Sequence, residues 1–140
     1  MIGLSVVLWT VTALGGLALA GVWYRALRRT GSTYDPGYVE RGAVTAGKVA
    51  PHATLAVGGL ILFAATAAVP AGEPKTAARV LALVLLVVGM GIGTAMFTQW
   101  MKGRSDSEAD AALPAAVVIG HGLLAVATLV VAVIATIAAR

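Results

Sequence analysis

The chain has 140 residues, of which 59% are apolar and 11% are charged, and its formal net charge is +4. This composition places it among membrane proteins and excludes an ordinary soluble domain. The basic residues do not cluster with aromatic or polar readers, which argues against nucleic acid binding, and the absence of cysteine excludes disulfides, iron–sulfur ligation and c-type haem attachment.

The first apolar run covers residues 2–24. No basic residue precedes it and a group of arginines follows it, which is the reverse of the charge order in a secretory signal peptide. We therefore expect a retained first membrane span. Trp23 stands at its end, where an indole ring favours the membrane interface.

The first loop, residues 25–48, is basic and contains turn residues before a stretch that could form a short interfacial helix from residue 38 to residue 50. The basic edge has two interpretations: an ordinary topological anchor, which we favour, or a site for anionic lipid headgroups or an acidic partner. Its arginines are Arg25, Arg28, Arg29 and Arg41.

Three further apolar runs of spanning length follow, at residues 49–70, 77–100 and 113–139, with a second loop on the same side as the first at 101–112. Pro51 is expected in the first turn of its span, where a missing N–H costs nothing. Because only helices satisfy their own backbone in lipid, the sequence predicts an all-α, four-helix transmembrane bundle forming a single domain over residues 1–140.

Loop charges predict the orientation of the chain. Loops 25–48 and 101–112 carry seven Lys and Arg residues against three elsewhere, which predicts that these loops are cytoplasmic and that both termini are outside. The abundance of Ala, Gly and Val is typical of a bacterial source rich in G and C, so we expect a multi-pass protein of the bacterial cytoplasmic (inner) membrane.

The two halves of the chain resemble one another. A shift of 69 residues places His52 on His121, and a shift of 77 places Gly16 on Gly93 and Trp23 on Trp100. This pattern predicts two repeated hairpins that run in the same direction and are related by a pseudo-twofold axis along the membrane normal.

His52 and His121 are the only histidines, and each stands near the start of an apolar span. On facing helices of a bundle, two imidazoles can ligate haem b axially, and small residues one turn further along, such as Ala56 and Ala125, would leave room for a macrocycle. The alternatives are another functional role for the pair, or structural histidines bonded to the backbone or to a neighbouring helix, which we favour at this stage.

Glycines are frequent in the first and third spans. Gly16, Gly89 and Gly93 include a Gly-x-x-x-Gly spacing, which is typical of close helix packing. The functional alternative is a slot for a cofactor or a lipid.

The four-span layout, the outside N-terminus and the basic first loop followed by Pro51 resemble the membrane-associated glutathione and eicosanoid enzymes. The resemblance implies a glutathione-dependent membrane enzyme. The corresponding stretch here, from Arg41 through Gly42 and Ala43 to Lys48, lacks the Asn and Glu of that family's signature, so none of its functional residues is carried over.

No span carries an acidic or basic residue well inside it, and no Ser/His/Asp set is present. The sequence therefore favours a small non-catalytic accessory or interaction subunit of a larger membrane complex, with lipids, other membrane subunits or further copies of itself as partners. The alternative is a b-type haem electron-transfer protein that uses His52 and His121. A glutathione-dependent enzyme is the distant third hypothesis.

Overall fold

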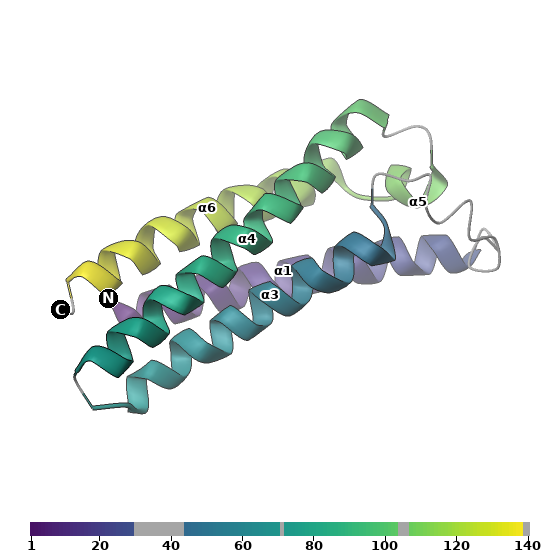
Figure 1. The fold of residues 1–140 in the computed structure, drawn as a ribbon. Coiled ribbons are helices and arrows are strands. Elements are labelled where there is room, and N and C mark those ends of the chain that lie inside the picture. The colour runs from purple at the N-terminus through teal and green to yellow at the C-terminus, as the bar shows by residue number, and fades with distance from the viewer. Residues whose placement is uncertain (30–43, 71, 104–106, 139–140) are drawn as a thin grey trace.

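The computed structural model describes residues 1–29, 44–70, 72–103 and 107–138. Within these ranges the chain is helical and contains no strand. Figure 1 shows the long helices laid side by side and the short helix α5 at an end of the bundle. The helices are α1 (Ile2–Arg29), α3 (Ala46–Ala65), continued by the 3₁₀ turn η2 (Thr66–Ala68), α4 (Glu73–Gly103), the short α5 (Glu108–Ala111) and α6 (Ala115–Ile137).

The long helices pack mainly as two pairs, α1 with α6 and α3 with α4. Met1 and the end of α6 lie at one end of the bundle, and α5 lies at the other (Figure 1). Consequently α1 and α4 run toward the α5 end, whereas α3 and α6 run away from it. The segments that approach the α5 end are therefore the second halves of α1 and α4 and the first halves of α3 and α6.

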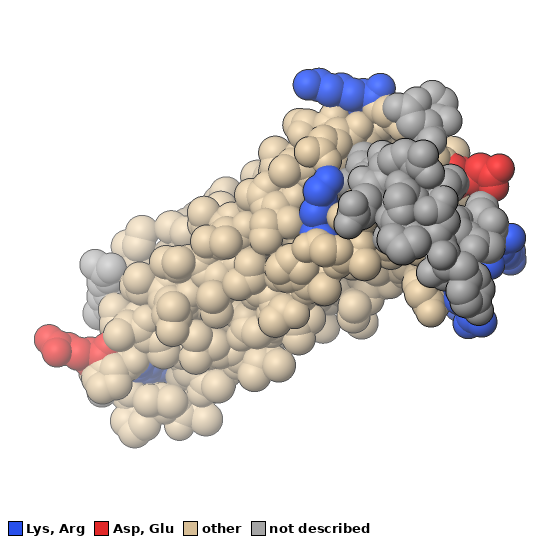
Figure 2. Space-filling model, turned by 45° about the vertical axis from the view of Figure 1, so that its right-hand side comes forward, with Lys and Arg blue, Asp and Glu red and all other residues tan. Residues whose placement is uncertain are grey.

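All four long helices are long and apolar enough to cross a membrane. Many large apolar side chains point outward, among them Leu14, Val84 and Leu123, which would be costly in water and is ordinary in lipid. On the face shown in Figure 2, Lys, Arg, Asp and Glu lie toward the two ends of the molecule, and a broad uncharged surface lies between them. These features fit a multi-pass helical membrane protein.

Helices α1 and α4 extend beyond the predicted apolar runs, whereas α6 covers Ala115–Ile137 instead of residues 113–139. α1 continues to Arg29, and α4 covers Glu73–Gly103 instead of residues 77–100. The expectation that Pro51 lies in the first turn of its helix is wrong, because α3 begins at Ala46 and Pro51 stands inside it. Residues 46–50, expected in a separate interfacial helix, belong to α3 instead, and residues 38–43 of that prediction lie outside the described part of the chain.

The short helix α5 lies in what the sequence indicated as a loop. The hydroxyl of Ser107 caps it by accepting a hydrogen bond from the backbone N–H of Asp110. The carbonyl oxygen of Asp110 in turn accepts a hydrogen bond from Nε1 of Trp100, at 3.0 Å. This contact holds α5 against the end of α4 and buries the Trp100 ring with that of Trp23.

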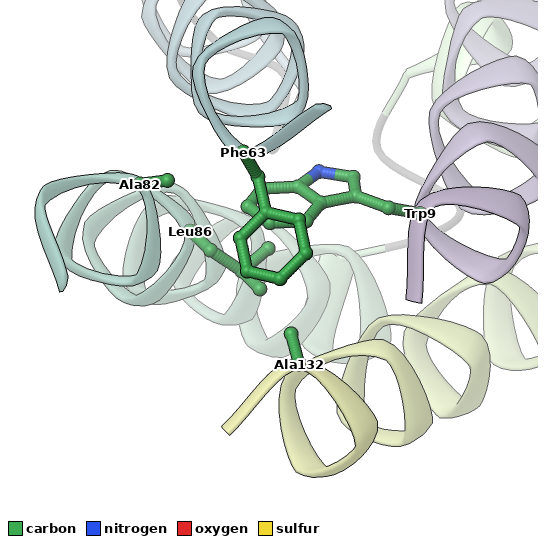
Figure 3. Close-up of a cluster of buried hydrophobic side chains, with 5 residues drawn as sticks. All are labelled: Trp9, Phe63, Ala82, Leu86 and Ala132. Carbon is green, nitrogen blue, oxygen red and sulfur yellow. The ribbon is translucent and has the colours of Figure 1, made fainter. Parts of the chain in front are cut away.

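The half of the bundle nearer the termini has a solid apolar core (Figure 3). Trp9 and Phe63 fill its centre with their ring centroids 5.7 Å apart, and Nε1 of Trp9 donates a hydrogen bond to the carbonyl of Ala56 on α3. Satisfying the indole N–H inside the bundle is what permits a tryptophan to be fully buried there. The smaller members of the cluster are Ala82, Leu86 and Ala132.

One buried polar contact joins α1 to α6. The hydroxyl oxygens of Thr12 on α1 and Thr128 on α6 lie 3.0 Å apart, and Thr12 also donates to the carbonyl of Leu8. We expect Thr128→Val, which keeps the shape of the side chain, to lower the free energy of unfolding by about 0.6 kcal/mol, the mean for hydrogen bonds between membrane helices. Unfolding in mixed micelles measures this change. A loss several times larger would mean that the hydroxyl pair does more than join two helices.

Arg79 is buried in α4 and only 3% exposed. Its Nε donates a hydrogen bond of 3.1 Å to the hydroxyl of Thr66, the residue that ends α3. A cation at the C-terminus of a helix is favourable because the last carbonyls carry partial negative charge. Arg79, which the sequence analysis counted only as an outside charge, thus ties α4 to the end of α3.

Candidate functional site

The fold brings His52 of α3 and His121 of α6 together. Both helices begin at the α5 end, and each histidine stands six residues after the first residue of its helix. Equal depth on two helices that run in the same direction places the side chains at the same level. The ring centroids lie 6.3 Å apart, with the ring planes at 79° to one another.

The His52 ring is held in place by α4. Its Nδ1 lies 2.8 Å from the backbone carbonyl oxygen of Gly89. A carbonyl only accepts, so Nδ1 carries the proton and the lone pair of the neutral ring belongs to Nε2. Gly93, one turn further along α4, faces the same ring: a Cβ at this position would lie 2.9 Å from Cε1 of His52.

The His121 ring lies against α1 in a corresponding way. A Cβ at Gly16 would also lie 2.9 Å from Cε1, here of His121. The backbone of Thr12, one turn earlier on α1, faces this ring. Nδ1 of His121 is nevertheless buried without a hydrogen bond of ordinary geometry to any described residue. Each imidazole is thus seated on a glycine of the neighbouring helix.

The two rings line a cavity of about 340 Å³. This volume lies within the range of roughly 300–1,000 Å³ that is usual for small-molecule and cofactor sites. Aromatic residues, among them Trp23 and Trp100, line the cavity toward the α5 end, and the histidines are its principal polar groups. The residues that line the cavity come from all four long helices and include Gly16, Trp23, His52, Gly93, Trp100 and His121.

No group of three or more His, Cys, Asp or Glu side chains gathers anywhere in the described part of the chain. A metal ion held by His52 and His121 would therefore have to complete its coordination with ligands of another kind. A porphyrin supplies four nitrogens in a plane and needs from the protein only the two axial positions.

No known protein family, curated protein or solved structure matches this chain. The chemistry of the site is therefore read from the two imidazoles and their surroundings.

The other residues that the sequence singled out are Gly89, which packs against α3, and the arginines of the basic edge, which lie at the end of α1. Gly89 approaches α3 closely, since a Cβ there would meet Leu55 at 3.4 Å, and its carbonyl orients His52. The arginines of the basic edge are exposed in the last two turns of α1, at the α5 end. They are Arg25, Arg28 and Arg29; the fourth, Arg41, lies outside the described residues.

Of the small residues expected beside the rings, Ala125 lines the cavity, and Ala56 is not among its lining residues. Gly16 and Gly93 on other helices also lie against the rings, and the sequence favoured packing for these glycines with a cofactor slot as the alternative. The 77-residue repeat that pairs these glycines was the sequence signal that could have linked them to the paired histidines.

Proposed function

We propose that this protein binds one haem b between His52 and His121 and serves as a one-electron carrier of the membrane. The observation that carries the proposal is the pair of facing imidazoles, 6.3 Å apart between centroids, on one cavity. With nitrogen–metal bonds of about 2.0 Å, as imidazole forms with metals, and about 1.1 Å from Nε2 to the ring centre, two axial histidines stand roughly 6 Å apart. The distance in the bundle agrees with that value.

The hydrogen bonding of the rings supports the same conclusion. A metal-ligating histidine usually donates its other N–H to a carbonyl or carboxylate, which fixes the tautomer and the ring orientation. His52 has this partner in the carbonyl of Gly89. Nε2 of either histidine makes no hydrogen bond with a described residue, so both nitrogens are available to a ligand in the cavity.

Haem supplies one-electron exchange between ferric and ferrous iron. The chain's own residues have three tasks at the site. His52 and His121 would bind the iron, Gly16 and Gly93 leave room for the imidazoles, and the apolar cavity wall would exclude water. An environment of this kind, together with bis-histidine ligation, sets the reduction potential.

We also propose that the two hairpins are structural repeats, which would place the iron on their pseudo-twofold axis. The buried positions support this. Four of the five buried residues of α1 have buried partners in α4 at a shift of 77, and the partner of the fifth, Leu27, lies outside the described residues. All three buried residues of α3 and η2 have buried partners in α6 at a shift of 69. The pairs are Ser5 with Ala82, Trp9 with Leu86, Thr12 with Gly89, Trp23 with Trp100, Gly59 with Thr128, Phe63 with Ala132, and Thr66 with Ala135.

The contacts of the histidines follow the same relation. His52 lies against Gly93 and its Nδ1 meets the backbone of Gly89; His121 lies against Gly16 and faces the backbone of Thr12. Each of these α4 residues is 77 positions after its α1 counterpart. A twofold axis between two such halves offers equivalent ligands to the two faces of one planar cofactor.

The setting we propose is the cytoplasmic membrane of a bacterium, with both termini outside and the α5 end in the cytoplasm. The basic residues of α1's last turns and Lys102 at the end of α4 support this orientation, because basic loops are retained on the cytoplasmic side.

The test is a dithionite-reduced minus oxidised visible spectrum of the protein purified in mild detergent from haem-replete cells. We expect a sharp b-type α-band at about one haem per chain. Apoprotein titrated with haemin should give the same spectrum and saturate at one equivalent. A flat spectrum in both experiments would overturn the haem proposal. The accessory or interaction subunit favoured by the sequence would then be the remaining proposal, to be tested by what co-purifies.

A second candidate is a copper(I) site. The thioethers of Met90 and Met96 line the same cavity as the histidines, and thioether and imidazole ligands suit copper(I). Metal analysis of the purified protein separates the two candidates. Stoichiometric copper without a haem spectrum would favour this candidate, and stoichiometric iron with a b-type spectrum would exclude it.

A further inference from the structure

We infer that the redox centre exchanges electrons with one side of the membrane only, the side of the α5 end. This inference rests on the proposed haem site. It adds that the protein is not a conduit across the membrane, and that electron donor and acceptor both reach the centre from the same side.

The position of the histidines along the helices is the first observation. His52 stands seven residues after Thr45, the N-cap of α3, and 16 residues before Ala68, the end of η2. At a rise of 1.5 Å per residue these separations correspond to about 10 Å and about 24 Å. His121 divides α6 in a similar way, between Ala115 and Ile137. Measured along α3 and α6, the site is therefore nearer the end at which these two helices begin than the end at which they stop.

The second observation is where the cavity lies. Its lining comes from the second half of α1, the start of α3, the second half of α4 and the first half of α6. All four segments belong to the half of the bundle that approaches the α5 end. Its members closest to that end include Trp23, Val44, Trp100 and Leu113.

The third observation is what fills the opposite half. There the core consists of Trp9, Phe63, Ala82, Leu86 and Ala132, and none of these side chains is a metal ligand (Figure 3). Further along α3 and α6, away from the α5 end, Thr66 and Ala135 are both fully buried. Electron tunnelling weakens steeply with distance.

The charged residues near the cavity also favour one orientation of the macrocycle, with its carboxylates toward the α5 end. Haem carries two carboxylates, which are stable only near water or cations. Lys48 stands one helical turn from His52 toward the α5 end and donates a hydrogen bond to Gln99 of α4. The arginines of the last turns of α1 lie at this end too. At the opposite end Arg79 is buried against Thr66, so its charge is turned away from the cavity. The carboxylates would therefore point toward the α5 end.

Haem held by His52 and His121 would supply one-electron exchange between ferric and ferrous iron, from a one-electron donor to a one-electron acceptor, with no atom transferred. Both partners are redox carriers that approach the α5 end, either from the adjacent aqueous phase or from the neighbouring lipid leaflet.

Sealed membrane vesicles of both orientations test the inference with the full-length holoprotein. Dithionite, which crosses membranes slowly, is added to oxidised vesicles, and the appearance of the α-band is followed in a stopped-flow instrument. We expect immediate reduction in inverted vesicles, where the α5 end faces outward, and in right-side-out vesicles a loss of this fast phase that detergent restores. A trapped nitrobenzoxadiazole dye, which dithionite bleaches only in leaky vesicles, reports sealing.

Equal fast phases in both sealed preparations would overturn the one-sided site. A fast phase only in right-side-out vesicles would support the one-sided site and reverse the orientation proposed from the loop charges. A missing α-band after detergent is added would instead contradict the proposed haem binding itself, so the two failures are distinguishable.

Discussion

Replacing either histidine, as His52→Ala or His121→Ala, is expected to abolish the six-coordinate b-type spectrum and to reduce bound haem to background. Each substitution removes one of two axial ligands, and no other His or Cys side chain exists in the chain to replace it. The haem-to-protein ratio and the reduced-minus-oxidised spectrum measure the effect. Thr54→Ala is the matched control, since Thr54 is exposed two residues from His52 on the same helix.

The fold should survive these changes. His52→Ala removes one interhelical hydrogen bond, to Gly89, which is worth about 0.6 kcal/mol between membrane helices. Supplying imidazole to His52→Gly should restore part of the six-coordinate spectrum, because the free ligand can enter the space left by the side chain. His52→Met should raise the reduction potential if it binds haem, as His/Met ligation does. Retention of full haem by both alanine variants would exclude the axial roles.

Gly93→Ala and Gly16→Ala form the second large prediction. A Cβ at either position would lie 2.9 Å from the Cε1 of a histidine, closer than carbon atoms approach, so the imidazole must move. We expect haem affinity to fall roughly 10–100-fold, as it does when groups that orient a metal ligand are changed. Titration of the apoprotein with haemin measures the dissociation constant.

Gly91→Ala and Gly21→Ala are the matched controls. They lie on the same two helices, and a Cβ at either site meets nothing within 4 Å. Because alanine favours helix by about 1 kcal/mol over glycine, these controls should bind haem normally and be no less stable than the parent protein. If Gly93→Ala bound haem as tightly as Gly91→Ala, the fit between glycine and imidazole would have no part in the site.

If the halves are true repeats, the two glycine variants should also resemble one another. Gly16→Ala displaces His121 and Gly93→Ala displaces His52, and the two contacts have the same length. Similar losses of affinity are therefore expected. A large loss in one variant and none in the other would mean that only one half of the site is built as the repeat requires.

The membrane spans could be predicted because apolar length is a local property of the chain. Each of the four predicted runs coincides with a long helix. The ends could not be predicted in this way, since α1 and α4 continue through charged residues such as Arg29 and Lys102. Those residues are compatible with helix, and at the ends of the bundle they reach water, so hydrophobicity does not mark where the helices stop.

Pro51 shows how local rules fail at such an end. A proline near the start of an apolar run indicates the first turn of a helix. In the structure the helix begins five residues earlier, at Ala46. Pro51 therefore stands inside the helix although it has no backbone N–H to donate. Lys48, the one polar residue of the added stretch 46–50, donates a hydrogen bond to Gln99 of α4.

The sequence by itself determined that this is a helical membrane protein with four spans, and it singled out His52 and His121 as the only histidines, placed alike in two similar runs. Only the tertiary structure decided that the two rings meet, that glycines of other helices seat them, and that the cavity lies in one half of the bundle. The reason is rotational: each residue turns a helix by about 100°, so a side chain's direction is fixed only when the helix packs. Hydrophobicity can be read along one chain segment, whereas a site made by four helices depends on how each is turned toward the others.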